Sequence, residues 1–218
     1  MKRFGVDEAG RGPVFGSMFA AAVFVEDRSR LPDGVGDSKR LSPARREDLA
    51  ARLRETAGVS VGLAEVTPAT IDDPETDMNT LTVEAHASAI GDALESVAEA
   101  GVSGLCDACD TDAGRFARRV EAACEPPVSV TARHGADDES PLVGAASIVA
   151  KVERDAHVAA IAERYGEVGS GYPSDPTTRA FLESYVADHR ELPPFARASW
   201  STCADALARV EQTGLGEF

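Results

Sequence analysis

The sequence predicts an α/β protein in which a mixed β-sheet is covered by helices, and three observations support this prediction. Short apolar segments typical of strands recur through the first 133 residues. Serine–proline pairs typical of helix starts occur twice, and the last third of the chain shows helical patterns only. Strands first, then helices alternating with strands, then helices alone is the order expected of a sheet with helices packed on it.

Five strands and six helices are expected. The strands are predicted at residues 3–8, 17–25, 58–66, 103–108 and 128–133. The helices are predicted at about residues 42–57, 79–100, 112–123, 141–165, 175–189 and 199–211. Ser42 before Pro43, and Ser140 before Pro141, are typical N-cap and first-turn pairs. Because no repeat or low-complexity linker interrupts this order, we expect one domain over residues 1–211 and a short tail over residues 212–218.

The charge of the chain is strongly negative. Its 218 residues are 43% hydrophobic and have a formal net charge of −15. Taken alone, that charge argues against nucleic acid, which basic surfaces bind. However, the chain has only three lysines against nineteen arginines, and an acidic, lysine-poor surface suits molar salt, where the Debye length falls to about 3 Å. We therefore interpret the charge as salt adaptation, and Lys39 and Lys151 become candidates for a functional role.

The sequence gives no sign of a membrane segment. No apolar run approaches the roughly 18 residues that a membrane-spanning helix needs, and the start MKRF leads directly into a predicted strand rather than a signal peptide. We therefore expect a soluble, monomeric protein of the cytoplasm.

Two adjacent carboxylates lie at the end of the first predicted strand and begin the string DEAGRGP at residues 7–13. Asp7 and Glu8 would project to opposite sides of the strand end, so they do not both serve packing. Gly10 and Gly12 permit unusual backbone angles and a close approach of substrate, and Arg11 between them is a charged donor suited to phosphate. Surface acids in a polar turn are the alternative interpretation of Asp7 and Glu8 alone, but the full string is more specific.

Two further acids occur next to predicted strands. Asp107 lies within an apolar segment, where an unpaired carboxylate is costly to bury unless a cation, hydrogen bonds or an open cleft compensate. Asp137 precedes the long helix near residues 141–165. The alternatives are a surface position for Asp107 and a favourable helix-dipole contact for Asp137.

Together these acids favour a site for hard cations. Mg²⁺ and Mn²⁺ take oxygen ligands, and four converging carboxylates could hold two ions about 4 Å apart for displacement at a phosphodiester. The four histidines are scattered along the chain and form no competing metal-binding pattern.

Five strings, in one order, resemble archaeal ribonuclease HII over nearly the whole chain. They are GVDEAGRGP at residues 5–13, DSKRLS at 37–42, CDACD at 106–110, GAASIVAKVERD at 144–155 and GSGYPSDP at 169–176. The resemblance implies a ribonuclease H-like fold with a central mixed five-stranded sheet flanked by helices and a helical C-terminal extension. Together with the acidic, lysine-poor composition, it indicates a halophile.

The resemblance also implies the catalytic residues. The four acids of the family that bind the metals correspond to Asp7, Glu8, Asp107 and Asp137. The family often has a basic residue where Gly135 stands here, and Asp138 adjoins Asp137, so the fourth ligand stays open. Asp155 is the other candidate, although it suits better as a partner of a neighbouring arginine such as Arg154.

Substrate contacts are implied in the same way. The turn of Gly10, Arg11 and Gly12 would contact the ribonucleotide 2′-hydroxyl, which distinguishes RNA from DNA. Tyr172 would pack on the sugar at an RNA–DNA junction. Phosphate-facing positions correspond to Lys39 and Lys151, and Ser147, in the same string as Lys151, is also expected to bind substrate.

The last seven residues resemble the peptide by which replication enzymes bind a sliding clamp. Gln212, Leu215 and Phe218 are spaced by three, so one helical turn would place Leu215 and Phe218 on one side as apolar anchors. A tail whose phenylalanine packs on its own domain is the alternative.

The function expected is metal-dependent hydrolysis, with Mg²⁺ or Mn²⁺, of the RNA strand of RNA–DNA hybrids. Incision on the 5′ side of single ribonucleotides in duplex DNA, leaving 3′-hydroxyl and 5′-phosphate ends, is also expected. A DNA-only nuclease of the same fold is one alternative, which Tyr172 and the turn at residues 10–12 disfavour. A nucleic-acid-binding module without catalysis is another, and the presence of all four acids gives it no support.

Overall fold

The chain divides into two compact units. The structure, a computed structural model, describes residues 3–36, 41–97 and 101–215, with side chains as far as residue 212. The first unit comprises Met1–Ala9, Met18–Glu65 and Asp77–Glu153. The second comprises Gly10–Ser17, Val66–Thr76 and Arg154–Phe218. The interpretation of residues 1–211 as one domain stays a prediction.

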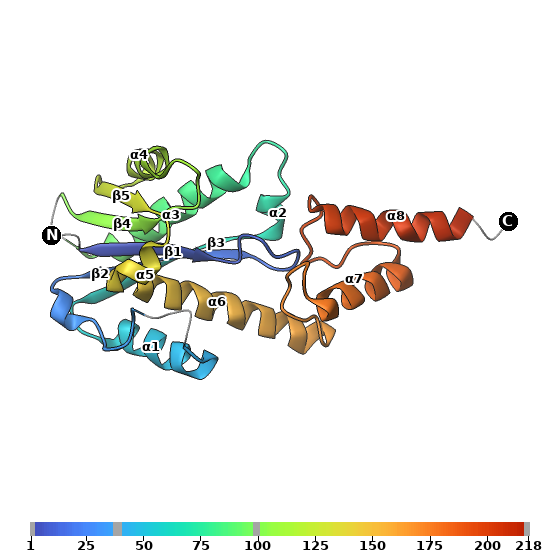
Figure 1. The fold of residues 1–218 in the computed structure, drawn as a ribbon, viewed down its shortest axis with the longest axis horizontal. Coiled ribbons are helices and arrows are strands. Elements are labelled where there is room, and N and C mark those ends of the chain that lie inside the picture. The colour runs from blue at the N-terminus through green and yellow to red at the C-terminus, as the bar shows by residue number, and fades with distance from the viewer. Residues whose placement is uncertain (1–2, 37–40, 98–100, 216–218) are drawn as a thin grey trace. The chain divides into compact units, whose positions relative to one another are not determined.

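A mixed five-stranded sheet forms the centre of the first unit (Figure 1). Its strands are β1 (Phe4–Ala9), β2 (Met18–Val25), β3 (Val59–Val66), β4 (Ser103–Asp107) and β5 (Ser129–Arg133). Their order across the sheet is β3-β2-β1-β4-β5. β1 pairs antiparallel with β2 and parallel with β4, and β4 pairs parallel with β5. The central strand of the sheet is therefore β1, which carries Asp7 and Glu8.

Helices cover both faces of this sheet. They are α1 (Pro43–Glu55), α3 (Met78–Leu94), α4 (Ala113–Ala123), the short α5 (Ala136–Glu139) and the first half of α6 (Pro141–Tyr165). Figure 1 shows α1 and α6 on one side of the sheet and α3 and α4 on the other. The apolar layer beneath α1 and α6 includes Val23 and Val25 of β2, Leu49 and Leu53 of α1, and Val149 of α6, all buried.

A glycine lets α6 approach the central strand closely. A Cβ atom at Gly5 would lie 2.3 Å from the carbonyl carbon of Leu142, closer than real Cβ contacts allow. Any side chain at this position would therefore push the start of α6 away from β1. The close contact places the α6 residues Ser147 and Lys151 near Asp7 of β1.

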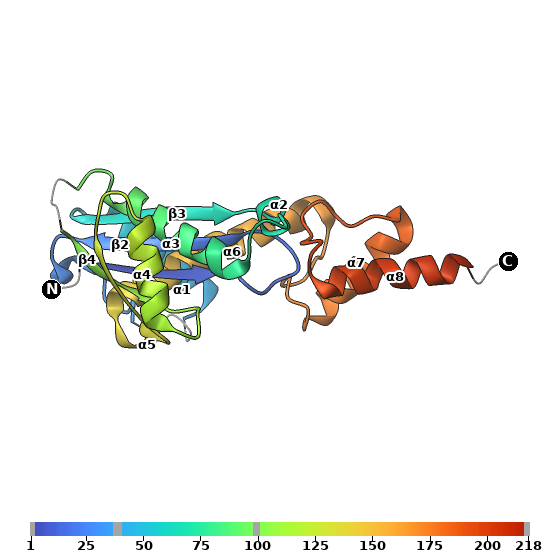
Figure 2. The same cartoon turned by 90° about the horizontal axis from the view of Figure 1, so that it is seen from above.

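The second unit is mainly helical. It contains α2 (Pro68–Ile71), the end of α6, α7 (Pro176–His189) and α8 (Ser201–Leu215). Figures 1 and 2 show α7 and α8 side by side. Its own apolar core includes Phe15, Ile161, Leu182, Phe195 and Cys203, with the ring of Phe15 edge-on to that of Phe195 at 5.2 Å between centroids.

The predicted α/β class with a mixed, helix-covered sheet is confirmed, and each predicted strand lies within one residue of its observed bounds. Two helices end elsewhere than expected. α3 ends at Leu94 rather than at residue 100, and in the turn after it the Val97 N–H donates to the Leu94 carbonyl at 2.9 Å. α8 continues to Leu215 rather than ending at residue 211. The short helices α2, α5 and η1 (Arg28–Arg30) have no periodicity long enough to predict.

None of the helices in the described part of the chain is long and apolar enough to cross a membrane.

Candidate active site

Asp7 and Asp107 lie at the same edge of the sheet. Val6 of β1 pairs with Cys106 of the parallel strand β4, so the next residues along both strands are Asp7 and Asp107. The carboxyl ends of neighbouring parallel strands meet at one edge, which is where sites form in sheets of this kind. Together with Glu8, these two residues form what we call the acidic centre.

Asp7 is the most strongly perturbed carboxyl group of the acidic centre. Its side chain is buried, with 6% of its surface exposed. Burial, and then the negative charges of Glu8 and Asp107, raise the pKa of Asp7 to about 8, although Ser147 and Lys151 act in the opposite direction. Ionising Asp7 at neutral pH therefore requires additional positive charge.

Glu8 is held by a fully buried histidine. The His86 Nε2 atom lies 2.8 Å from Glu8 Oε2, and the His86 ring is edge-on to Phe116 at 5.2 Å between centroids. The other ring nitrogen, Nδ1, is buried without a hydrogen-bond partner among the described residues. This pattern favours the tautomer with its proton on Nε2, which donates to the carboxylate and fixes its direction.

Asp107 is held by the start of α5. Its Oδ1 atom accepts a hydrogen bond from the Ala136 N–H at 2.7 Å, which the left-handed conformation of Gly135, with φ 65°, presents toward the strand end. Asp137, the predicted fourth ligand, follows in the first turn of α5 and is buried, with 5% exposed. The hydrogen bond from Ala136 to Asp107 therefore holds the start of α5 at the end of β4, and the role of Asp137 as fourth ligand stays a prediction.

Ser147 and Lys151 lie one helical turn apart on α6 and contact each other. The Lys151 ammonium donates to the Ser147 hydroxyl, and both residues lower the pKa of Asp7. Lys151 is therefore a cation beside the acidic centre, in keeping with its predicted contact with phosphate.

A neighbouring acid is already committed to an ion pair. Asp110 is buried and accepts two hydrogen bonds from Arg115, at 3.0 and 2.5 Å. This guanidinium holds the pKa of Asp110 well below its usual range. Asp110 therefore orders the loop after β4.

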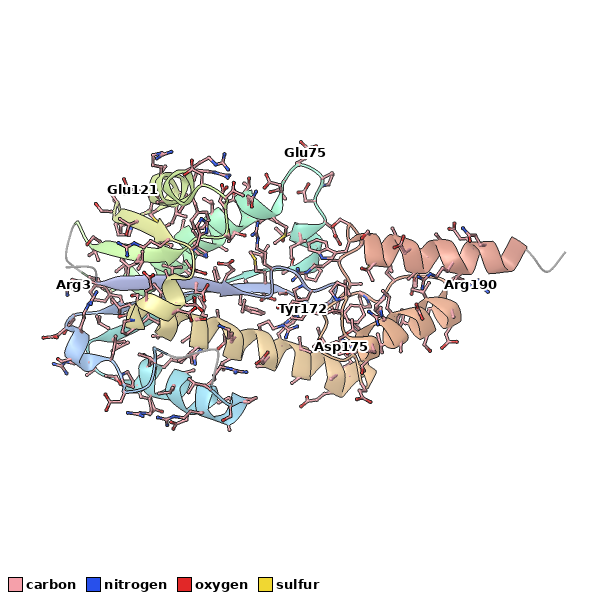
Figure 3. The ribbon with its side chains drawn as sticks, viewed as in Figure 1. Arg3, Glu75, Glu121, Tyr172, Asp175 and Arg190 are labelled. Atoms are coloured by element: carbon pink, nitrogen blue, oxygen red, sulfur yellow. The ribbon has the colours of Figure 1, made fainter. Side chains whose placement is uncertain are left out.

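The turn of Gly10, Arg11 and Gly12, which we call the GRG turn, belongs to the second unit together with Tyr172. Gly10 has φ 88°, a conformation that glycine adopts readily. A Cβ atom placed at Gly12 would lie 3.8 Å from Cε1 of Tyr172, so the turn and the tyrosine are neighbours. Tyr172 is 39% exposed and lies in the segment just before α7 (Figure 3).

The Tyr172 ring is supported by Arg154. The Arg154 guanidinium lies 5.1 Å from the centre of the ring and donates to the Ser170 carbonyl. Arg154 also lies 3.4 Å from Asp155, so Asp155 has the arginine partner that the sequence suggested.

Three predicted site residues fall wholly or partly outside the described structure. Lys39 and Phe218 lie outside the described residues, and Leu215 is described by its backbone only. Gln212 is exposed on α8. The roles of all the predicted site residues stay predictions.

The donor chemistry of the acidic centre fits a hard divalent cation. Its oxygen atoms are carboxylate oxygens, which such cations prefer, and the charges of Glu8 and Asp107 add to the larger effect of burial in raising the pKa of Asp7. Among the described residues, no three His, Cys, Asp or Glu side chains converge as ligands of a single ion. Glu8 accepts a hydrogen bond from His86, and Asp107 accepts one from the Ala136 N–H, so both carboxylates of the acidic centre have fixed directions.

Comparison with known proteins places the chain in a family. The family described as Ribonuclease HII matches residues 4–203. The chain belongs to the ribonuclease HII family. It is an endoribonuclease of the ribonuclease H class, and the family and its structures support hydrolysis of the RNA strand of RNA–DNA hybrids.

Similar ribonuclease HII proteins cover the whole chain. Ribonuclease HII of Haloarcula marismortui is 61% identical over 99% of this chain and 100% of its own length. The crystal structure of ribonuclease H2 from Pyrococcus horikoshii has a TM-score of 0.87 and 38% identity, covering 97% of this chain and 100% of that one. Ribonuclease HII of Archaeoglobus fulgidus, solved in a complex with PCNA, has a TM-score of 0.81 and 37% identity, covering 94% and 96%. These matches confirm the ribonuclease H-like fold and the resemblance to the enzymes of halophilic archaea.

Sequence reasoning missed two residues of the ribonuclease HII site region. His86 was counted among scattered histidines, although its spacing of four from Thr82 and from Ile90 places it on the buried face of α3. A histidine on such a face needs a polar partner, which is a usable signal. Arg197 is fully buried, but an arginine in a loop segment gives no sign of burial in the sequence.

Proposed function

We propose that this ribonuclease HII incises duplex DNA on the 5′ side of a single embedded ribonucleotide, as well as the RNA strand of hybrids, leaving 3′-hydroxyl and 5′-phosphate ends. The observation that supports this proposal best is the acidic centre, where a buried Asp7 is crowded by two other carboxylates. Such a concentration of negative charge suits the cations that phosphodiester hydrolysis requires.

The proposed metal ligands are Asp7, Glu8, Asp107 and Asp137, and the proposed cofactor is Mg²⁺ or Mn²⁺. When bound, the ions would lower the pKa of the attacking water and stabilise the leaving oxygen. His86 and the Ala136 N–H fix the directions of Glu8 and Asp107. Lys151 beside Asp7 supplies a charge for the scissile phosphate or its neighbour, with Ser147 orienting the ammonium.

Recognition of the ribonucleotide is assigned to the GRG turn and Tyr172. The main chain of the turn would contact the 2′-hydroxyl, and the exposed Tyr172 ring would pack on the adjacent sugar. Support comes from the closeness of Gly12 to the Tyr172 ring and from the exposure of both residues. The chain passes directly from Ala9 of β1 to Gly10, so the turn follows the strand of Asp7 and Glu8 without a linker. Lys39 is proposed as a further phosphate contact.

The test is cleavage of a duplex with one ribonucleotide in one DNA strand, in molar KCl with Mn²⁺ or Mg²⁺. The wild type is compared with Asp7→Asn and with Asp48→Asn, an exposed acid of the same unit that pairs with Arg45. Metal-dependent cutting on the 5′ side of the ribonucleotide, lost only in Asp7→Asn, is the expected result.

Other results would revise the proposal in distinct ways. Cutting of long hybrids but not of the single ribonucleotide would remove the junction role of Tyr172. Equal cutting by wild type and Asp7→Asn would remove the acidic centre from catalysis. The chemistry of the ends is checked by ligation, because only a 3′-hydroxyl next to a 5′-phosphate can be sealed by a DNA ligase.

We also propose a sliding clamp as a partner, bound through Gln212, Leu215 and Phe218. The relative from Archaeoglobus fulgidus was solved with PCNA, and here α8 extends to Leu215, so the spacing of Gln212 and Leu215 is that of one helical turn. Titration calorimetry with an archaeal sliding clamp should show binding that Phe218→Ala abolishes and Glu211→Ala retains. Binding unaffected by Phe218→Ala would exclude this tail. The cytoplasmic location and monomeric state stay predictions.

A further inference from the structure

Arg197 is the largest fully buried side chain of the described structure. A buried guanidinium is costly unless its donors are satisfied, and here the acceptors are three backbone carbonyls. Nε donates to Gly16 at 2.9 Å, and the two terminal nitrogens donate to Arg11 at 2.9 Å and to Gly10 at 2.5 Å. Two of these three acceptors belong to the GRG turn.

The third carbonyl of the turn is held by the same segment of chain. Trp200 Nε1 donates to the Gly12 carbonyl at 3.3 Å, and its ring lies 5.0 Å from the Arg197 guanidinium carbon. Arg197 and Trp200, only three residues apart, therefore hold the carbonyl oxygens of all three residues of the turn.

The segment that carries Arg197 is itself fixed. The Asp72 carboxylate accepts hydrogen bonds from the N–H groups of Ala198 and Ser199 at 2.7 and 2.9 Å. The Arg197 N–H donates to the Val14 carbonyl at 2.8 Å. All of these residues belong to the second unit, so the backbone that carries the guanidinium is fixed at Arg197 itself and at the two residues that follow it.

Arginine is required here by geometry rather than by charge. No carboxylate accepts from its guanidinium in the hydrogen bonds that the structure records, and burial lowers the pKa of Arg197 to about 10, so the group is still charged at neutral pH. Only a planar guanidinium presents several donors in fixed directions, whereas an ammonium acts as a single point. A lysine could not reach carbonyls on three different residues at once.

We infer that Arg197 is a positioning residue that sets how strictly the GRG turn distinguishes ribose from deoxyribose. This inference rests on the proposed contact of the turn with the 2′-hydroxyl. With its carbonyls fixed by Arg197 and Trp200, the turn is held in one conformation before substrate binds, which makes a hydrogen bond to a single hydroxyl selective.

The test is the ratio of kcat/KM for two duplexes that differ at one sugar. One carries a single ribonucleotide and the other carries a 2′-fluoro nucleotide in its place, whose fluorine cannot donate a hydrogen bond. A site built around a hydroxyl rejects an analogue that lacks it by roughly 10⁴-fold, and slow cleavage is measured under single-turnover conditions. For Arg197→Lys we expect this ratio to fall at least about 10-fold.

The ratio separates positioning from mere stability. A loss of folded enzyme would lower both rates together and leave the ratio unchanged, which would overturn the inference. The matched control is Arg190→Lys, in the same unit, whose exposed side chain donates to the Val210 carbonyl at 3.2 Å, and its ratio should equal that of the wild type. A change of the same size in Arg190→Lys would also overturn the inference.

A second variant decides the matter if Arg197→Lys does not fold. Trp200→Phe keeps a ring over Arg197 but removes the donor to Gly12, and we expect a smaller fall of the ratio in the same direction. An unchanged ratio in folded Trp200→Phe would overturn the inference. A wild type that shows no preference for the ribonucleotide would instead overturn the proposed function, so the two failures are distinguishable.

Discussion

The acidic centre and the GRG turn are consecutive in the chain, yet they are stabilised in opposite ways. In the acidic centre, like charges are brought together and burial raises the pKa of Asp7 to about 8. In the turn, a buried cation is surrounded by neutral carbonyls that it satisfies. In the acidic centre, Lys151 offsets only part of the effect of burial and like charge on Asp7, whereas in the turn the donors of the buried guanidinium are satisfied by the protein.

This difference matches what each region is proposed to do. A site for exchangeable cations must keep negative charge that the chain does not neutralise, at a cost in stability. A surface that recognises one hydroxyl group must have its shape before substrate arrives, so its internal hydrogen bonds are complete. Disrupting either region should therefore change activity, but with opposite effects on stability.

The largest effect is expected from Asp7→Asn. Cleavage should fall at least about 10³-fold, because the substitution removes a proposed metal ligand, and bound ions contribute several kcal/mol to the transition state. In EDTA at pH 8 the variant should nevertheless unfold at a higher temperature than wild type, since a neutral amide avoids the cost of a buried, repelled carboxylate. Each kcal/mol corresponds to roughly 2–4 °C in a protein of this size. Differential scanning fluorimetry and the cleavage assay measure both quantities.

Asp48→Asn is the control, with cleavage and unfolding temperature close to wild type. An Asp7→Asn protein that unfolds at a lower temperature than wild type in EDTA would show that Asp7 stabilises the fold, contrary to the comparison made above.

A smaller effect is expected from His86→Phe. The ring keeps its packing against Phe116 but no longer donates to Glu8, so the carboxylate loses its fixed direction. Loss of such an outer hydrogen bond typically weakens metal binding about 10–100-fold. The Mn²⁺ concentration for half-maximal cleavage should rise by that factor, with kcat at saturating Mn²⁺ changed less. An unchanged Mn²⁺ requirement in a folded variant would show that His86 serves packing alone.

The two regions also differ in how far the sequence predicted them. The strands were predictable because each is a short apolar run, and the acids at their ends follow from strand positions in the chain. Asp7 and Asp107 could be grouped from the sequence by the preference of hard cations for carboxylate oxygens, whereas the parallel pairing of β1 with β4 that brings them to one edge comes from the structure. The fixing of Glu8 by His86 depends on how α3 packs, which periodicity alone does not give.

The sequence predicted that the GRG turn has a special backbone conformation, but it did not predict which residues hold the turn in place. Its glycines indicate a special backbone, whereas the contact with Arg197 joins residues separated by more than 180 positions. No local pattern encodes such a pairing, and the surrounding residues Ala196 and Ala198 do not distinguish a buried arginine from an exposed one. The end of α3 was similarly beyond prediction, because the helix is followed by a turn in which the Val97 N–H donates to the Leu94 carbonyl, and residue propensities do not place such a turn.

Salt should separate exposed charge from buried charge. Molar KCl screens surface carboxylates but acts little on buried ones. We expect the unfolding temperature of wild type to rise by several degrees between dilute buffer and molar KCl, which corresponds to roughly 1–3 kcal/mol in the free energy of unfolding. Salt adaptation of a protein with net charge −15 requires such a rise. The difference between Asp7→Asn and wild type in EDTA should stay almost constant. Circular dichroism melts that are unaffected by KCl would contradict salt adaptation.

The smallest effect is expected from Asp175→Asn, near Tyr172 in the second unit (Figure 3). Asp175 caps α7 and accepts the Ser170 N–H at 2.6 Å and the Thr177 N–H at 2.9 Å. These hydrogen bonds, that of Ser170 first, lower the pKa of Asp175 to about 2. Asparagine is also a good N-cap, so the variant should lose only the benefit of the charge.

The stability of Asp7→Asn and of Asp175→Asn, each relative to wild type, should change with pH in opposite directions. The folded pKa of Asp175 lies below its value of about 3.9 in an unfolded chain, so its stabilisation is present above pH 4 and is lost as the pH falls toward 2. At pH 7, Asp175→Asn should therefore unfold at a lower temperature than wild type, and this difference in unfolding temperature should shrink as the pH falls toward 2. The folded pKa of Asp7 is raised, so its cost grows as the pH rises from 4 to 8, and the advantage of Asp7→Asn grows with it. Melts in EDTA and molar KCl from pH 2 to 8 measure both margins, and parallel pH profiles would show that the two regions are stabilised in the same way.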